Sequence, residues 1–321
     1  MVGEIAKLMD SGLVFVAYGA ARASGDPRAA AFKERMYGDE RVRGIVDELR
    51  GWPGPSLNSH KSARQFFHKL AFLADIGMAI DDPGVQTVIE AAIEHRDDNG
   101  IPLLPMNIGK GYGGTGETTW AWALCDAPTT LYALITLGYR DAGIDRAVDY
   151  LCTRRMGDCW GCVVSDALGT WRGPGKKGDP CPYATLIMLK LLLAYDADRY
   201  RDIIVAGARR LLDLWKNSQS EHPYIFYMGT DFRKLKLPFI WYDVLHLVEI
   251  LSQVPAVRDD ASFLEMVRVI LDKERPDGGF IPESVYQEWK SWDFGQKKAR
   301  SDWLELRVAL IRARMADGAR A

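Results

Sequence analysis

The stretch that decides the fold is residues 70–101, LAFLADIGMAIDDPGVQTVIEAAIEHRDDNGI. It contains an apolar segment, a glycine at Gly77, an acidic turn and a second segment with apolar residues at three- and four-residue spacing. That spacing is typical of an amphipathic helix. We therefore expect two helices here, joined as a hairpin.

The same pattern recurs at residues 131–160, 186–215 and 244–280. Gly77 and Gly138 coincide at an offset of 61 residues, and Tyr139 and Tyr195 coincide at an offset of 56. A repeat of this length indicates an array in which each hairpin buries its apolar face against the next. The sequence predicts an all-α fold of about ten to twelve helices. We expect one domain over residues 1–321, an α/α toroid of concentric inner and outer helices, with a helical lead-in (1–39) followed by hairpin repeats (40–315).

Composition narrows the class of protein. Apolar residues make up 48% of the 321 residues, charged residues 26%, and the net charge is −2. These values exclude a disordered chain and a whole-chain basic field for nucleic acid. The apolar run at residues 13–21 is too short for a bilayer span, which leaves peripheral membrane contact open. An odd count of five cysteines favours reduced thiols, and we expect a cytoplasmic protein.

Two motifs resemble a known superfamily. ERPDGGF at residues 274–280 is similar to the Q-x-x-D-G-x-W element of squalene and oxidosqualene cyclases, with weaker echoes at residues 96–101 and 155–160. RGPGKKGDPCPY at residues 172–183 resembles the β-subunit of protein prenyltransferases. The chain thus resembles the terpenoid cyclase and protein prenyltransferase superfamily of α/α toroids.

The resemblance implies roles for individual residues. Arg172 with Lys176 or Lys177 would hold a diphosphate, and Asp179 and Cys181 would hold zinc. Pro182 interrupts the motif before Tyr183, and the family's third zinc ligand, a histidine, has no counterpart at its place. The nearest candidates are Asp243 and His246. The aspartate-rich acid of squalene cyclases is absent from the sequence.

The cysteines offer an alternative metal set. Cys125 and Cys181 coincide at the offset of 56, so both are expected at the starts of inner helices. Cys159 and Cys162 lie on the loop that leads to the second of these. Four thiolates suit zinc, although thiols that bind no metal, buried or exposed, fit the pattern better. Cys152 is expected in the core.

Acidic and aromatic residues supply the catalytic and lining candidates. Aspartates recur at inner-helix starts, where the helix dipole favours an acid; they are Asp126, Asp179, Asp243 and Asp302. Asp126 is the preferred general acid, and Asp179 and Tyr183 complete the catalytic candidates. Aromatic faces stabilise carbocations, and core packing is their alternative use. The substrate-binding candidates are Glu117, Trp120, Trp122, Trp160, Trp241, Tyr242 and Trp303, together with Arg172, Lys176 and Lys177.

The resulting hypothesis is an enzyme similar to prenyltransferases and terpene cyclases, acting on an isoprenoid, a prenyl diphosphate or another apolar substrate in a central cavity. Two alternatives stay open. Toroids also host glycosidases and lyases, where Asp126 with Glu117 or Asp179 would form a carboxylate pair. A non-catalytic repeat scaffold that binds a protein partner is the other.

Overall fold

The computed structural model describes residues 2–171, 178–220, 222–223 and 226–318. Helices dominate this part of the chain: it contains 13 α-helices and two small two-stranded sheets. The expectation of a mainly helical protein is confirmed. The chain divides into two compact units, residues 46–227 and residues 1–45 with 228–321.

Three helices that are buried on nearly all sides form the centre of the unit at residues 46–227. They are α5 (Phe66–Asp75), α7 (Ala127–Thr136) and α9 (Pro182–Asp196). The helices pack in chain order, α5 against α7 and α7 against α9. In α9 every residue from Pro182 to Leu192 is buried. Burying each large apolar side chain in this row stabilises the fold by about 1.5–3 kcal/mol.

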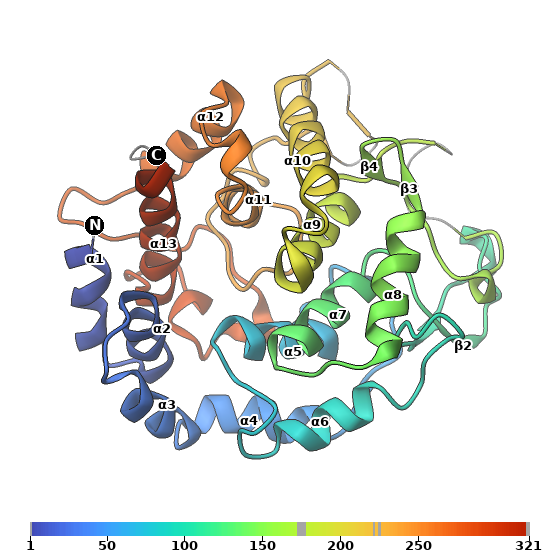
Figure 1. Cartoon of the computed structure of the whole chain (residues 1–321), viewed down its shortest axis with the longest axis horizontal. Coiled ribbons are helices and arrows are strands. Elements are labelled where there is room, and N and C mark those ends of the chain that lie inside the picture. Colours follow the sequence, from blue (N-terminus) through green and yellow to red (C-terminus); the bar gives the residue numbers. More distant parts are fainter. Residues whose placement is uncertain (1, 172–177, 221, 224–225, 319–321) are drawn as a thin grey trace. The chain divides into compact units, whose positions relative to one another are not determined.

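Three amphipathic helices alternate with this row along the chain (Figure 1). They are α6 (Val85–Ala92), α8 (Ala142–Thr153) and α10 (Arg201–Lys216). In α8 the buried residues recur at three- and four-residue spacing, and α10 packs against α9. One face of each helix is thus covered and the other meets solvent. This is the hairpin order that the repeats predict.

The repeated glycines end equivalent helices. Gly77 follows α5 with φ +88° and Gly138 follows α7 with φ +97°. One residue further on, the N–H of Met78 donates to Leu73 O and the N–H of Tyr139 donates to Leu134 O, each at 2.9–3.0 Å. Both ends have the Schellman pattern, which needs a left-handed residue where only glycine is unstrained. The 61-residue offset therefore reflects a shared backbone requirement.

Two short hairpins interrupt the helical repeats of this unit. Strand β1 (Leu104–Asn107) pairs antiparallel with β2 (Thr118–Ala121), with Leu104 opposite Ala121. Strand β3 (Arg155–Met156) pairs antiparallel with β4 (Cys159–Trp160). Apolar residues from both strands of the first hairpin pack with Leu57, Phe67 and Leu168 in one cluster. The sequence contained no sustained alternating pattern because each strand is only two to four residues long.

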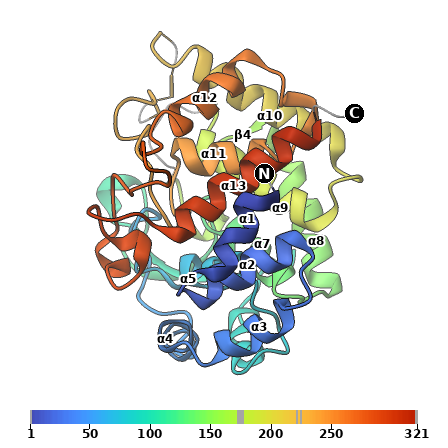
Figure 2. The ribbon, with the colours of Figure 1, turned by 90° about the vertical axis from the view of Figure 1, so that its left-hand side faces the viewer.

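The second unit joins the two ends of the chain. Its helices, shown in Figure 2, are α1 (Val2–Lys7), α2 (Val14–Ser24), α3 (Ala29–Tyr37), α11 (Val244–Leu251), α12 (Ala261–Leu271) and α13 (Asp302–Gly318). Helix α13 packs against α1 and α2, and the Ser11 hydroxyl donates to Asp302 at 2.5 Å. Helix α4 (Glu40–Leu49) crosses the boundary between the units.

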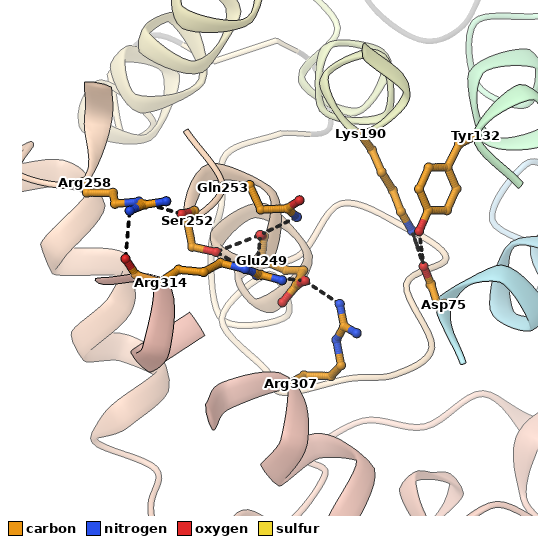
Figure 3. Close-up of polar contacts among 9 residues, drawn as sticks. All are labelled: Asp75, Tyr132, Lys190, Glu249, Ser252, Gln253, Arg258, Arg307 and Arg314. Atoms are coloured by element: carbon orange, nitrogen blue, oxygen red, sulfur yellow. Dashed lines mark hydrogen bonds and ion pairs between the residues drawn. The ribbon is translucent and has the colours of Figure 1, made fainter. Parts of the chain in front are cut away.

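One buried ion pair ties the three central helices of residues 46–227 together (Figure 3). The Lys190 ammonium on α9 lies 3.1 Å from the Asp75 carboxylate on α5, and both side chains are less than a tenth exposed. Tyr132 of α7 donates its hydroxyl to Asp75 at 2.6 Å, while its ring lies 4.1 Å from the Lys190 ammonium. Because each of these groups has a polar or charged partner, the two charges can stay buried.

A carboxylate clamp holds α11 to α13 in the other unit, also drawn in Figure 3. Glu249 is 2% exposed and pairs with Arg307 and Arg314 from α13. Arg314 also donates to the Ser252 hydroxyl at 3.0 Å, and the Arg258 guanidinium donates to Arg314 O at 2.8 Å. These contacts provide hydrogen-bond partners for polar groups near the end of α11 and fix α13 beside it.

Across the described residues, no helix combines the length and the apolar character needed to cross a membrane. The closure of the repeats into a ring stays a prediction.

Candidate functional site

The start of α7 buries a carboxylate bonded to a histidine. Asp126 is the N-cap residue of α7 and has no exposed surface. Its Oδ2 atom lies 2.8 Å from His60 Nε2 and accepts the N–H of Ala123 at 3.0 Å. Its Oδ1 atom has no hydrogen-bond partner among the described residues. One carboxylate oxygen is thus held in place while the other is available for a proton or a ligand.

His60 lies in the segment that precedes α5, and contacts with other residues hold it in place. His68, on α5, bonds through Nε2 to the His60 carbonyl oxygen at 2.8 Å. Burial lowers the pKa of His68 to about 3, so this ring stays neutral. On its other side the His60 ring is stacked on half-buried Trp171, with centroids 6.0 Å apart and planes inclined by 15°. These contacts orient His60 toward Asp126.

Burial favours the protonated form of Asp126. It raises the pKa of the Asp126 carboxyl, and the hydrogen bond from His60 and the N–H of Ala123 oppose that rise. A carboxyl in this setting favours its protonated form relative to one in water. The pair is therefore chemically suited to hold and transfer a proton.

Tyr183 lies beside this pair. It sits in the first turn of α9, is 1% exposed, and forms a side-chain hydrogen bond with Thr129 of α7. Burial raises the pKa of its phenol well above the ordinary value, and the electrostatic interactions with Cys125 and Asp126 act in the same direction. The sequence candidates Asp126 and Tyr183 are thus electrostatic neighbours.

Three of the predicted cysteines meet at the same end of these helices. Cys181 is the N-cap residue of α9, and Cys125 directly precedes the N-cap residue of α7, so their predicted placement at helix starts is confirmed. The Cys181 thiol is hydrogen-bonded with the thiols of Cys125 and Cys162. Cys159 contacts the Met156 carbonyl oxygen at 3.4 Å and the Arg210 side chain.

Zinc binding stays a prediction, both for Asp179, Cys181, Asp243 and His246 and for the four cysteines. Within the residues that the structure describes, no group of three or more His, Cys, Asp or Glu side chains is arranged to hold a metal ion. Asp243 is the N-cap residue of α11 and accepts the N–H of His246 at 2.9 Å, while His246 Nδ1 bonds to the Trp241 carbonyl oxygen. These contacts are those of a helix start. We derive no step through zinc.

Asp179 borders a small cleft near the thiols. The cleft has a volume of about 250 Å³ and is lined by Asp179, Pro180, Arg210, Asp213, Leu214, Asn217, His222 and Pro223. Arg210 is paired with Asp213, three residues further along α10. With acidic, basic and amide groups on its walls, this cleft suits a small polar molecule better than a hydrocarbon.

The other binding candidates belong to both units. Trp122, Trp160 and Trp303 are buried core residues; the indole N–H of Trp122 donates to Asp97 and that of Trp160 to the Leu151 carbonyl oxygen, each at 2.9 Å. Glu117 and Trp120 are exposed on or beside β2. Trp241 and Tyr242 precede α11 in the other unit. The predicted diphosphate ligands Arg172, Lys176 and Lys177 lie outside the described residues.

Sequence reasoning missed His60 as the partner of Asp126. His60 precedes helix α5, which begins at Phe66. His60 lies in the preceding irregular segment, 66 residues from Asp126. Neither the hydrophobic period nor the repeat offset carries a signal for such a contact.

The chain matches no protein-family model, and no curated protein shows significant sequence similarity to it.

Proposed function

We propose that this chain is an enzyme of the terpene cyclase and prenyltransferase kind, in which Asp126 donates a proton to the alkene of an isoprenoid or a similar apolar substrate. The observation that supports the proposal best is the fully buried Asp126 carboxyl, bonded to His60 through one oxygen and unbonded among described residues at the other.

Protonating an alkene requires an acid that is present in its protonated form and whose conjugate base is stabilised. Burial favours protonated Asp126. When the O–H bond breaks, the proton forms a C–H bond with the alkene, and the carboxylate that remains keeps its hydrogen bonds with His60 and the Ala123 N–H. Hydrogen bonds to an ionised group are stronger than those to a neutral one. The same contacts therefore stabilise the product of the proton transfer.

The surroundings of the pair suit an apolar substrate. Trp171 stacks on His60 and packs against the apolar cluster that includes Leu57 and Phe67. An indole face stabilises a cation by its ring quadrupole, by about 0.5–2 kcal/mol. Trp171 supplies such a face beside His60, the hydrogen-bond partner of Asp126.

The test is a product analysis in heavy water. Purified protein is incubated in D₂O with squalene, farnesyl diphosphate and geranylgeranyl diphosphate, and the extracts are analysed by gas chromatography and mass spectrometry. We expect a cyclised product that carries deuterium from the solvent-exchanged acid. Asp126→Asn, which keeps the shape of the side chain, should lower turnover by about 10²–10⁴-fold, since general acid catalysis contributes that much.

Asp82→Asn is the matched control. Asp82 is also a buried aspartate whose side chain accepts a backbone N–H, that of Ala79 at 2.8 Å, in the same unit. Its replacement should leave turnover unchanged. A folded Asp126→Asn variant with wild-type turnover would remove Asp126 from the mechanism, and a wild-type protein that converts none of the three substrates would refute the substrate class.

A further inference from the structure

The thiols of Cys125, Cys162 and Cys181, here called the thiol cluster, come from three separate segments. Two backbone pairings bring these segments together: Ala123 pairs antiparallel with Val164, and Gly161 pairs antiparallel with Pro180. The N–H of Leu124 donates to Val163 O at 2.9 Å, and the N–H of Cys181 donates to Trp160 O at 2.8 Å. Cys125 follows Ala123 by two residues and Cys162 precedes Val164 by two, so the first pairing brings the segments that carry these cysteines side by side.

The members of the cluster differ in access to solvent. Cys181 is 3% exposed and caps α9, where its sulfur accepts the N–H of Ala184 at 3.4 Å. Cys125 and Cys162 are half-buried, and all five cysteines of the chain are free thiols. A dissolved reagent can therefore reach Cys125 or Cys162, while Cys181 reacts only with a neighbour.

We propose that the thiol cluster is a thiol–disulfide exchange site, in which Cys181 forms a disulfide with Cys125 or Cys162 when the protein meets a small-molecule disulfide such as oxidised glutathione. This inference does not depend on the proposed function.

The reaction has two balanced steps. The thiolate of an accessible cysteine attacks one sulfur of the reagent, whose S–S bond breaks and releases one reagent thiol. The Cys181 sulfur loses its proton and attacks the mixed disulfide, releasing the second reagent thiol. The protein loses two hydrogen atoms, and the reagent is reduced to two thiols.

The surroundings of Cys181 favour the disulfide once it has formed. The neighbouring Cys125 thiol and burial raise the pKa of the Cys181 thiol, against a lowering contact from Cys162. A sulfur whose thiolate is poorly stabilised is a slow leaving group. Reduction that expels Cys181 is therefore disfavoured.

The test uses the full chain, reduced, freed of reductant and equilibrated with oxidised glutathione at pH 8. Non-reducing peptide mapping by mass spectrometry should show a peptide that joins Cys181 to Cys125 or Cys162, without a glutathione adduct on either. Cys181→Ser should lose this cross-link and accumulate glutathione on the accessible cysteines. Cys152→Ser, which removes a half-buried thiol from helix α8, is the matched control and should retain it.

A second variant covers poor folding of Cys181→Ser. Cys125→Ser/Cys162→Ser keeps the buried thiol and removes both of its neighbours, so no cross-link should form. The proposal is overturned if the wild type ends as glutathione adducts with Cys181 free, if the cross-link joins Cys125 to Cys162, or if it persists in either variant.

Discussion

Asp243→Asn should change how the stability of the protein depends on pH. Asp243 is buried at the start of α11, and burial raises the pKa of its carboxyl to about 7, although Lys236 and the N–H groups of His246 and Leu245 oppose the rise. Its Oδ2 atom has no hydrogen-bond partner in the described part of the chain. Asparagine keeps the helix cap and removes the charge.

The sign follows from proton binding. The folded carboxyl binds its proton more tightly than the unfolded one, whose pKa is near 3.8, so stability falls as the pH rises from about 4 through 7. The full difference of about three pKa units is about 4 kcal/mol. Between pH 5 and pH 8, the contribution of Asp243 to the free energy of unfolding falls by about 2.5 kcal/mol. The free energy of unfolding of Asp243→Asn, relative to wild type, should rise by this amount over that interval.

The measurement is urea unfolding at pH 5, 6, 7 and 8, followed by circular dichroism and tryptophan fluorescence. Subtracting the free energy of unfolding of the wild type from that of the variant at each pH cancels the contribution of the titratable groups that both proteins share. Asp260→Asn is the control, because Asp260 caps α12 in the same way, accepting the Ser262 N–H at 2.8 Å, but is exposed. A flat difference for Asp243→Asn, or one that falls with pH, would show that the Asp243 carboxylate is stabilised by Lys236 and refute the reasoning.

Three further predictions concern Lys190, Gly138 and Gly44. Lys190→Met should destabilise the protein by about 3–5 kcal/mol because it removes the cation that faces the buried Asp75 carboxylate. Adding Asp75→Leu should restore most of that loss in a urea-unfolding double-mutant cycle. Equal costs for the single and double variants would contradict this. Gly138→Ala should cost about 1–2 kcal/mol because of its φ of +97°. Gly44 lies inside α4 with open space where a Cβ would be, so Gly44→Ala should stabilise the protein by about 0.5–1 kcal/mol. Both glycine variants are measured by thermal unfolding. A change in stability of the same sign for both would contradict this account.

Local features of the site were open to prediction from the sequence. Cys125 and Cys181 lie at helix starts because a repeat offset carries equivalent positions along the chain. Asp126 follows from the preference of an acid for a helix N-terminus. The sequence could not predict which of Cys159 and Cys162 lies beside Cys181. Cys162 does, whereas Cys159 contacts Arg210. Which way each side chain of so short a hairpin points depends on its register, which the spacing of two cysteines leaves undetermined.

The sequence by itself determined the helices, their hairpin order and the glycines that end them, because these depend on a 3.6-residue period and on local backbone conformation. Only the tertiary structure decided which polar groups meet inside. His60 reaches Asp126 across 66 residues, and Lys190 reaches Asp75 across 115. Such pairs arise where packed helices and loops bring distant backbone segments within hydrogen-bond reach. No local period records that geometry, and burial then makes the largest contribution to the raised pKa of Asp126, on which the proposed chemistry depends.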